Sequence, residues 1–422
     1  MNPITQPRLG HIVHVLAAIL PFREPADVAL SRYFRQHHEL GSRDREFVAE
    51  TVFAALRRYR LLRHWAPDGT PRQLALIALT KISGFGVREL EAVLQEGEAD
   101  WLRQLKAGGG EEYSLAVLAD FPDWLVEKLR TFLSDADILT LGRAMQQPAP
   151  LDLRVNTLLA NRDEVLQILQ AEGVTAEATP FSPMGIRLAK KIALNKHPIF
   201  IEGKVEVQDE GSQLLGILLA PKRRDMVVDF CAGAGGKTLL LGALMHSQGR
   251  LYAYDVSDKR LAKLKPRLKR SGLSNVHPQL IVNENDIKVK RLAGKIDRVL
   301  VDAPCSGLGT LRRNPDLKWR QTPESVAELR VMQAAILAGA ARLPKAGGRL
   351  VYATCSLLPE ENEEVVEAFL AAHPDYRLID CSDILKQQRI PLDTGKYLKL
   401  LPQVHGTDAF FAAVLEKTAT DA

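Results

Sequence analysis

Two cysteines stand where strands are expected to end, and a thiol at such a place can act as a nucleophile. Cys305 comes soon after the apolar run Arg298-Val-Leu-Val, and Cys355 comes soon after Arg349-Leu-Val-Tyr-Ala; a serine follows each cysteine. A lone cysteine is more often a buried core residue. If the two runs are neighbouring parallel strands, their carboxyl ends lie about 5 Å apart at the crevice where such sheets bind ligands. The pair therefore favours covalent catalysis.

A cysteine nucleophile suits methylation of a cytosine base. Carbon 5 of cytosine is a poor nucleophile, and a thiolate that adds to carbon 6 converts the ring into an enamine that can take a methyl group from a sulfonium. A base must then remove the carbon 5 proton before the thiol can leave. Asp302, three residues before Cys305, can share a proton with the ring as charge builds, although such an acid can also simply cap a loop. We expect Asp302, Cys305 and Cys355 to be catalytic.

A glycine-rich loop after another expected strand predicts a nucleoside cofactor. It reads Asp229-Phe-Cys-Ala-Gly-Ala-Gly-Gly-Lys-Thr and leads into an apolar helix. Its glycines let the backbone turn tightly beside a ligand at the helix N-terminus. A P-loop would need glycine where Cys231 stands, and a dinucleotide fingerprint would need glycine in place of Thr238. The loop residues expected to contact the cofactor are Cys231, Ala232, Gly233, Ala234, Gly235, Gly236 and Lys237.

Acidic residues at the next two strand ends support a nucleoside. Asp255 lies 19 residues beyond Gly236, where a carboxylate can accept hydrogen bonds from both ribose hydroxyls. Asp286 follows the third expected strand and can accept from an exocyclic adenine amine. Each acid alone has an alternative interpretation as a helix N-cap. Together with the glycine-rich loop they favour a bound nucleoside.

The pattern of expected helices and strands along the chain predicts three domains. Residues 1–143 have helical periodicity and predict an all-helical domain, for example where Phe47, Val48, Val52, Phe53 and Leu56 recur at helical spacing. Residues 144–205 are a small α/β segment. Residues 206–422 alternate short apolar strands with helices, which is typical of an α/β, Rossmann-like doubly wound sheet of order 3-2-1-4-5.

Composition permits a polyanionic partner without requiring one. The 422 residues include 56 Lys and Arg against 51 Asp and Glu, a net charge of +5. The N-terminal sequence does not resemble a signal peptide, and no apolar stretch approaches about 20 residues, so we expect a cytoplasmic protein with no membrane partner. The four cysteines, which include Cys231 and Cys381, form no Cys-x-x-Cys pair. We expect neither a disulfide framework nor a metal site.

Two basic stretches bear on nucleic acid binding. Residues 259–270 contain seven Lys and Arg and no acid, but the leucines among them predict a helix packed on the sheet, whose exposed charge is either a solvated face or an RNA contact. The second stretch follows Cys305 and combines basic side chains with a tryptophan, which suits phosphate contacts and base stacking. Its RNA-binding candidates are Arg312, Arg313, Lys318, Trp319 and Arg320.

Four motifs together resemble the Nop/Sun family of RNA cytosine-5 methyltransferases, and within it the bacterial 16S rRNA methyltransferase B type. They are the glycine-rich loop, Asp302-Ala-Pro-Cys-Ser-Gly, Arg313-Asn-Pro-Asp-Leu-Lys-Trp and Tyr352-Ala-Thr-Cys-Ser-Leu-Leu-Pro-Glu-Glu-Asn. With Val207-Gln-Asp-Glu-Gly-Ser, the resemblance covers roughly residues 145 to 417. One departure is Gly233-Ala234, where the family often has Ala-Pro.

The resemblance implies a cofactor, roles and a substrate. S-adenosyl-L-methionine would be bound by the loop from Cys231 to Lys237 with Asp255, Asp286 and Asp302. Cys355 would attack the base and Cys305 would assist its release. The segment Leu40-Gly-Ser-Arg-Asp-Arg-Glu-Phe looks like part of a NusB-like RNA-binding domain, and the middle segment would be ferredoxin-like or RRM-like. The implied substrate is 16S rRNA, with tRNA as the alternative, and the implied state is a monomer.

Two other functions remain open from the residues. A DNA cytosine-5 methyltransferase would use the Pro-Cys cysteine as its nucleophile and would not need Cys355. A non-catalytic RNA-binding or assembly factor would keep the fold as a scaffold. Such a scaffold would need neither the two thiols nor Asp302, which argues against it.

Overall fold

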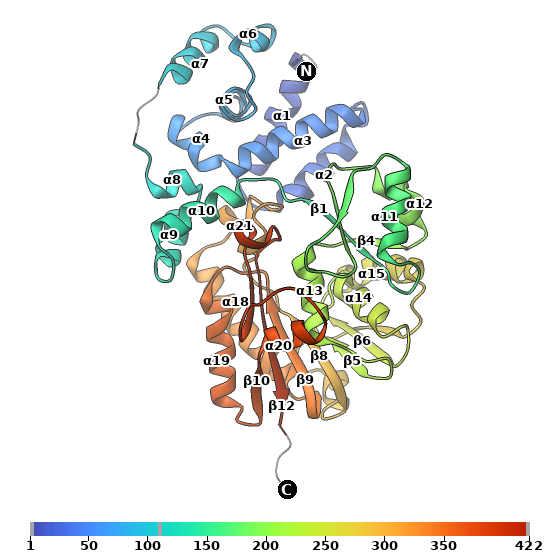
Figure 1. Cartoon of the computed structure of the whole chain (residues 1–422). Coiled ribbons are helices and arrows are strands. Elements are labelled where there is room, and N and C mark those ends of the chain that lie inside the picture. The colour runs from blue at the N-terminus through green and yellow to red at the C-terminus, as the bar shows by residue number, and fades with distance from the viewer. Residues whose placement is uncertain (1–3, 109–111, 419–422) are drawn as a thin grey trace. The chain divides into compact units, whose positions relative to one another are not determined.

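The computed structural model describes residues 4–108 and 112–418, which divide into two compact units (Figure 1). The first unit comprises Met1–Pro148 and a distant segment, Thr310–Pro323. The second comprises Ala149–Gly309 and Glu324–Ala422. The distant segment was not expected to belong to the first unit, because sequence reasoning placed it beside the Cys305 loop.

The elements described in the first unit are helical, as the periodicity predicts. Val48, Val52 and Leu56 are buried in its core, while Phe47 and Phe53 pack against that core from partly exposed positions. Helices α1, α3 and α5 contact one another around this core. The helices are α1 (Gln6–Ile19), α2 (Ala26–Gln36), α3 (Ser42–Arg57), α4 (Tyr59–Trp65), α5 (Pro71–Ile77), α6 (Val87–Leu90), α7 (Glu98–Ala107), α8 (Leu115–Ala119), α9 (Asp123–Arg130), α10 (Asp135–Met145) and α17 (Leu317–Arg320).

The second unit begins with a small antiparallel sheet of order β2-β3-β1-β4. Its strand β1 begins at Leu151, where the sequence predicts a strand. The strands are β1 (Leu151–Val155), β2 (Ala176–Ala178), β3 (Gly185–Leu188) and β4 (Val205–Val207), with helices α11 (Arg162–Ala171) and α12 (Pro198–Ile201).

The large sheet of the second unit has the order β10-β12-β9-β8-β5-β6-β7. The five strands from β7 to β9 are parallel, which confirms the expected doubly wound order, and β12 runs antiparallel between β9 and β10. The strands are β5 (Met226–Asp229), β6 (Arg250–Asp255), β7 (Val276–Leu280), β8 (Ile296–Asp302), β9 (Pro344–Thr354), β10 (Tyr376–Ile379), β11 (Tyr397–Leu400) and β12 (Phe410–Lys417).

One strand is shifted from its expected place. The apolar run Gln279-Leu-Ile-Val predicts the third strand, but β7 begins at Val276 and ends at Leu280. Ile281 is buried, whereas Val282 is 81% exposed. The chain therefore leaves the sheet one or two residues earlier than the apolar run suggests.

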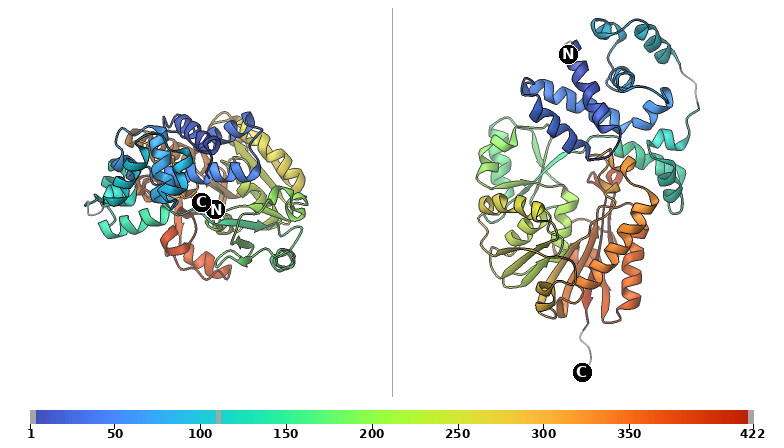
Figure 2. Two further views of the ribbon diagram at one scale, coloured as in Figure 1. Left: turned by 90° about the horizontal axis from the view of Figure 1, so that it is seen from above. Right: turned by 180° about the vertical axis from the view of Figure 1, so that it is seen from behind.

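Helices cover both faces of the large sheet (Figures 1 and 2). Neighbouring residues of β5 point to opposite faces, so Val227 and Val228 belong to different apolar cores. One face packs against α13 (Glu210–Leu219), α14 (Gly236–Leu244), α15 (Asp258–Ser271) and α20 (Cys381–Gln387). The other packs against α16 (Ile287–Arg291), α18 (Pro323–Ala340) and α19 (Glu363–Ala372). Within the described residues, no helix has the length and apolar character that crossing a membrane requires.

Candidate active site

The glycine-rich loop connects β5 to α14 at the carboxyl edge of the parallel strands. Gly233 and Gly235 have φ values of +57° and +85°, a region that side chains disfavour. A Cβ on Gly235 would lie 2.1 Å from Leu264 Cδ1, whereas a Cβ on Gly233 would meet nothing within 4 Å. The loop therefore packs tightly against α15 at Gly235 and borders open space at Gly233. Such a cradle before a helix N-terminus fits a nucleoside cofactor.

Two arginines, one buried and one partly exposed, hydrogen-bond to carbonyl groups of this loop, and their positions in the sequence do not identify them. Arg154 of β1 is 1% exposed and donates to the Gly236 carbonyl over 2.6 Å. Arg267 of α15 donates to the Ala234 carbonyl over 2.6 Å and forms an ion pair with Glu206 at 3.0 Å. Burial lowers the pKa of Arg154 to about 10. The small sheet thus contributes directly to the shape of the loop, through contacts that residue spacing does not reveal.

Asp255 lies at the loop, as expected. Its carboxylate is 3% exposed and accepts a hydrogen bond of 2.8 Å from the Gly233 N–H. The other carboxylate oxygen accepts from the Ser257 N–H at 2.8 Å, and Arg260 lies 3.0 Å away. Each carboxylate oxygen can accept a second hydrogen bond. Asp255 can therefore hold the loop and a ribose hydroxyl together.

Asp286 caps a helix, which is the alternative interpretation of its position. It is the N-cap of α16, and its side chain accepts from the Lys288 N–H at 2.8 Å. It also accepts from the Val282 N–H at 2.9 Å. These two backbone hydrogen bonds lower the pKa of Asp286. An adenine contact from this residue would have to be made in addition to the cap.

Asp302 ends β8 and forms an ion pair with the loop lysine. Lys237 Nζ lies 2.7 Å from the Asp302 carboxylate. Burial tends to lower the pKa of Lys237, but the negative charges around it, chiefly Asp302 and then Cys355 and Asp229, outweigh burial and raise that pKa. Lys237 is thus a charged ammonium that pairs with Asp302 and interacts electrostatically with Cys355.

Asp229, the last residue of β5, is a buried acid whose role residue spacing does not reveal. It is 1% exposed and accepts a hydrogen bond of 2.7 Å from the Thr238 hydroxyl. Burial raises its pKa from 3.8 to about 7, and the nearby charges of Asp302 and Asp255 act in the same direction. Burial also raises the pKa of the neighbouring thiol of Cys231.

The two cysteines meet, as their positions at neighbouring strand ends predict. Cys305 Sγ lies 3.4 Å from Cys355 Sγ, because β8 and β9 pair in parallel with Asp302 beside Ala353. The Cys355 N–H also donates to Cys305 Sγ at 3.4 Å. The hydrogen bond with Cys355, together with burial, raises the pKa of Cys305 well above its usual value. Cys305 is therefore a thiol that can share its proton with the Cys355 sulfur.

The basic segment after Cys305 is largely buried inside the first unit, which differs from the expected RNA surface. Lys318 is 3% exposed and Arg312 is 6% exposed. The Lys318 ammonium lies 3.0 Å from Asp120, and burial lowers its pKa. The Trp319 ring packs at 5.2 Å from Tyr59. These side chains stabilise the first unit, because a buried ammonium requires a paired carboxylate. Arg313 and Arg320 are partly exposed.

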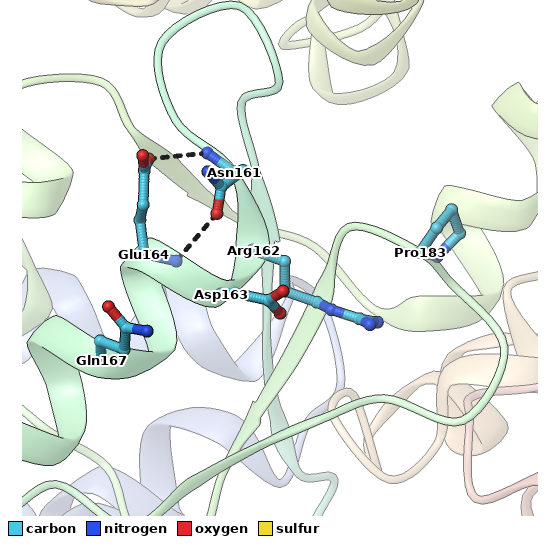
Figure 3. Close-up of a pocket in the computed structure, with 6 residues that line it drawn as sticks. All are labelled: Asn161, Arg162, Asp163, Glu164, Gln167 and Pro183. Atoms are coloured by element: carbon cyan, nitrogen blue, oxygen red, sulfur yellow. Dashed lines mark hydrogen bonds between the residues drawn. The ribbon is translucent and has the colours of Figure 1, made fainter.

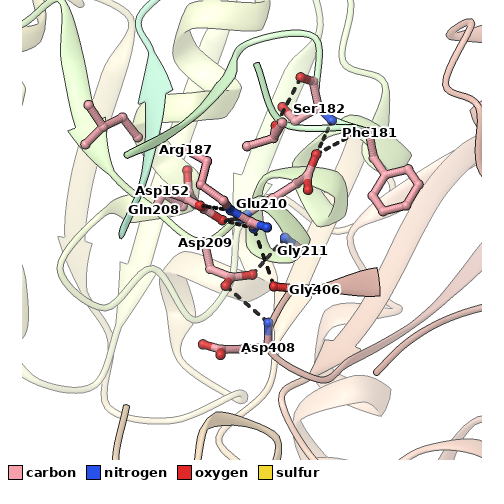
Figure 4. Close-up of polar contacts among 12 residues, drawn as sticks. Asp152, Phe181, Ser182, Arg187, Gln208, Asp209, Glu210, Gly211, Gly406 and Asp408 are labelled. Carbon is pink, nitrogen blue, oxygen red and sulfur yellow. Dashed lines mark hydrogen bonds and ion pairs between the residues drawn. The ribbon is translucent and has the colours of Figure 1, made fainter. Parts of the chain in front are cut away.

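The motif from Val207 to Ser212 joins the two sheets of the second unit (Figure 4). Glu210 is fully buried and accepts from the backbone N–H groups of Phe181 and Ser182 at 2.6 and 2.7 Å. Asp209 accepts from the Asp408 N–H at 3.2 Å. These contacts make the motif a structural junction between the loop at Phe181 and Ser182 and the segment that leads into β12.

The surface also has two hollows away from the cysteines. One, of about 480 Å³, lies over the first turn of α11 (Figure 3), where Asn161 and Glu164 cap the helix. The other, also of about 480 Å³, lies on the first unit beside His11 and Glu39. In the described residues, His11, His37 and Glu39 form a group whose ligand-type atoms lie within 4.8 Å of one another. His11 Nδ1 lies 2.8 Å from the Tyr33 hydroxyl, and His37 Nδ1 lies 2.7 Å from the Glu39 carboxylate. Neither hollow includes a residue of the glycine-rich loop.

Comparisons with known proteins agree with this geometry. Residues 216–416 match the family described as 16S rRNA methyltransferase RsmB/F, and residues 121–195 match the RsmF/B-like ferredoxin-like domain. A probable ribosomal RNA small subunit methyltransferase B from Synechocystis is 36% identical, over 93% of this chain and 95% of its own length. A similarly named Bacillus subtilis protein is 34% identical over 72% of this chain and 68% of its own.

A solved structure shows the same fold. A methyltransferase homolog protein from Pyrococcus horikoshii superposes with a TM-score of 0.58 at 28% identity, over 70% of this chain and 99% of that one. The fold and the glycine-rich loop define a Rossmann-like methyltransferase that uses S-adenosyl-L-methionine. The chain belongs to the 16S rRNA methyltransferase RsmB/F family.

Proposed function

We propose that this enzyme methylates carbon 5 of a cytosine in 16S rRNA through a covalent bond between Cys355 and carbon 6 of the base. The distance of 3.4 Å between the sulfurs of Cys305 and Cys355 carries the proposal. A nucleophile and a proton-sharing partner within hydrogen-bond reach form the arrangement that covalent catalysis requires. The family membership and the names of the relatives support RNA of the small ribosomal subunit as substrate. An rRNA substrate would place the enzyme's action in the cytoplasm.

Each residue of the site has a defined task in this reaction. The Cys355 thiolate, with the Lys237 ammonium nearby, adds to carbon 6, and the electron pair of the carbon 5–carbon 6 double bond becomes available at carbon 5. S-adenosyl-L-methionine, when bound, supplies the electrophilic methyl group. Asp302 shares a proton with the ring as charge develops. A base such as water then takes the carbon 5 proton, and the electron pair of that bond restores the carbon 5–carbon 6 double bond. The carbon 6–sulfur bond breaks with its electron pair passing to the Cys355 sulfur, and Cys305 assists this release by donating its proton to that sulfur.

Exposed lysines on α15 offer a surface for the RNA backbone. Lys259, Lys263, Lys265 and Lys269 are exposed, whereas Leu261 and Leu264 are buried on the opposite side of the helix. Lysines on a helix face can bind phosphates without reading sequence. We further propose that residues 1–143 form an NusB-like RNA-binding domain, that 144–205 is a small domain and that 206–422 is the catalytic domain.

The experiment separates the two thiols with single substitutions. Cys355→Ala should abolish both methyl transfer and any covalent adduct, because the nucleophile is gone. Cys305→Ala should still attack and methylate but fail to release the base. A protein–RNA species that survives a denaturing gel should therefore accumulate with Cys305→Ala in the presence of S-adenosyl-L-methionine.

The control is Cys381→Ala, which alters a fully buried cysteine on α20 and should release RNA normally. A stable adduct in Cys355→Ala and none in Cys305→Ala would reverse the roles and indicate the arrangement of a DNA cytosine-5 methyltransferase. Adducts with neither variant would exclude covalent catalysis. Using tRNA and 16S rRNA transcripts in parallel tests the choice of substrate.

A further inference from the structure

A fully buried glutamate connects the two loops that carry the cysteines. Glu361 is 0% exposed and lies six residues after Cys355, between β9 and α19. Its carboxylate accepts from the Ser306 N–H at 2.8 Å and from the Ser306 hydroxyl at 2.5 Å. The Ser356 hydroxyl donates to the same oxygen as the Ser306 hydroxyl. Glu361 therefore binds the residue that follows each cysteine.

Two further contacts fix the glutamate itself. Gln333 of α18 donates to the Glu361 carboxylate at 2.9 Å, and the same amide donates to the Pro304 carbonyl at 2.9 Å. The Tyr352 hydroxyl donates to the Glu361 carbonyl at 2.7 Å. A buried charge that receives this many hydrogen bonds is held in one geometry. Cys305 and Cys355 are each joined to the following serine by one peptide bond, so contacts that hold the serines also hold the cysteines in position.

The charges around the two sulfurs are unequal. On the Cys305 side stands Glu361, and its charge adds to the hydrogen bond with Cys355 and to burial in raising the pKa of Cys305. On the Cys355 side stands Lys237, which is paired with Asp302. Burial, and after it the charges of Cys305 and Glu361, raises the pKa of Tyr352, the residue whose hydroxyl donates to the Glu361 carbonyl. A negative charge disfavours a thiolate and a positive charge favours one.

We propose that Glu361 is a positioning residue that ties the two cysteine loops together and, through its charge, keeps Cys305 as the thiol and leaves Cys355 as the sulfur that attacks. This inference rests on the proposed function, in which Cys355 is the nucleophile and Cys305 assists release of the base. Its principal test requires neither RNA nor cofactor, so its failure and the failure of the proposed function are distinguishable.

The test measures alkylation of Cys305 by iodoacetamide as a function of pH, in the Cys355→Ala protein, with peptide mass spectrometry to separate the remaining cysteines. Glu361→Gln should move the midpoint of the pH profile to lower pH, which corresponds to roughly threefold to tenfold faster alkylation on the rising limb. Loosening of the loops alone would raise the plateau rate without moving the midpoint. Glu364→Gln makes the same chemical change at a partly exposed position and should leave the midpoint in place. Equal midpoints in the two glutamine variants would overturn the proposal.

A second variant tests the tie between the loops and covers the case in which Glu361→Gln does not fold. Glu361→Asp keeps the charge but is one methylene too short to reach both serines and Gln333. We expect kcat for methyl transfer to fall by about tenfold or more, since small misplacements of reacting groups are costly, while KM for S-adenosyl-L-methionine stays within about twofold. An unchanged kcat, or a rise in that KM with kcat preserved, would show that the glutamate does not position the thiols.

Discussion

Lys237 Nζ lies 2.7 Å from the Asp302 carboxylate, which joins the cofactor loop to the strand end that leads into the Cys305 loop. This ion pair is only partly exposed, so solvent screens it less than a surface pair. It keeps a positive charge beside Cys355 and holds the acid at the carboxyl end of β8. The cofactor loop and the nucleophile are thereby coupled through one pair of side chains.

Replacing the lysine should therefore slow the nucleophile. In Lys237→Met, the Cys355 sulfur loses the positive charge of this ammonium, so the rate of its reaction with iodoacetamide at neutral pH should fall by about threefold to tenfold. The rate of methyl transfer should fall as well. Lys222→Met removes an exposed surface lysine and serves as the control. If both variants react at the wild-type rate, the lysine does not act on Cys355.

Asp255 should be required for cofactor affinity. Asp255→Ala removes the carboxylate expected to accept from the ribose hydroxyls and also the hydrogen bond to Gly233. We expect binding of S-adenosyl-L-methionine to weaken by about 2 kcal/mol, the scale of hydrogen bonds to charged groups, as measured by calorimetry. Asp258→Ala alters an exposed acid three residues away and should bind normally. Unchanged affinity in Asp255→Ala would refute the assignment.

Asp229 should make stability depend on pH. Its pKa is raised in the folded protein from 3.8 to about 7, so folding favours the protonated acid. The stabilising contribution is complete below pH 3.8 and is lost as the pH rises through about 7. Asp229→Asn, which cannot ionise, should flatten the fall in melting temperature across this window. Melts with the same pH slope in Asp229→Asn, Asp258→Asn and the wild type would contradict the burial argument.

The lysines of α15 should contribute to RNA binding through charge alone. In Lys263→Ala combined with Lys265→Ala, the slope of log affinity against log salt should decrease in magnitude by about 1.5, the sum expected for two lost phosphate contacts. Cofactor affinity should stay the same. Lys290→Ala combined with Arg291→Ala removes two exposed charges from α16, on the other face of the sheet. Equal slopes in the two double variants would mean that α15 is only a solvated face.

The strand order of the large sheet and the proximity of the Cys305 and Cys355 thiols could be predicted from the sequence. Strand order follows from alternating apolar runs and helices, and a residue that comes soon after one of two adjacent parallel strands must lie near its counterpart, as Cys305 and Cys355 do. The glycine loop and Asp255 follow from the same rule. Such residues can be predicted because secondary structure alone determines their neighbours.

Residues whose roles depend on distant partners could not be predicted. Lys318 lies in a basic stretch with a tryptophan, which is typical of an RNA contact. In the structure, Asp120, 198 residues away in the sequence, pairs with it inside the first unit. Arg154 is a charge within a short strand, and only the fold brings it to the Gly236 carbonyl. Glu361 stands within a motif that the resemblance includes, yet its link to both serines depends on the pairing of β8 with β9. Burial and long-range pairing are properties of the fold rather than of spacing.

The position of β12 has a consequence for how the enzyme is made. This strand comes last among the described elements, yet it lies inside the sheet, with Phe411 paired to Thr354 next to Cys355. Chains leave the ribosome from the amino end, so the nucleophile and its strand emerge before the neighbour that supports them. A nascent chain therefore carries an incomplete catalytic sheet until β12 has left the ribosome. A premature stop codon before position 410 removes an interior strand rather than a dispensable tail.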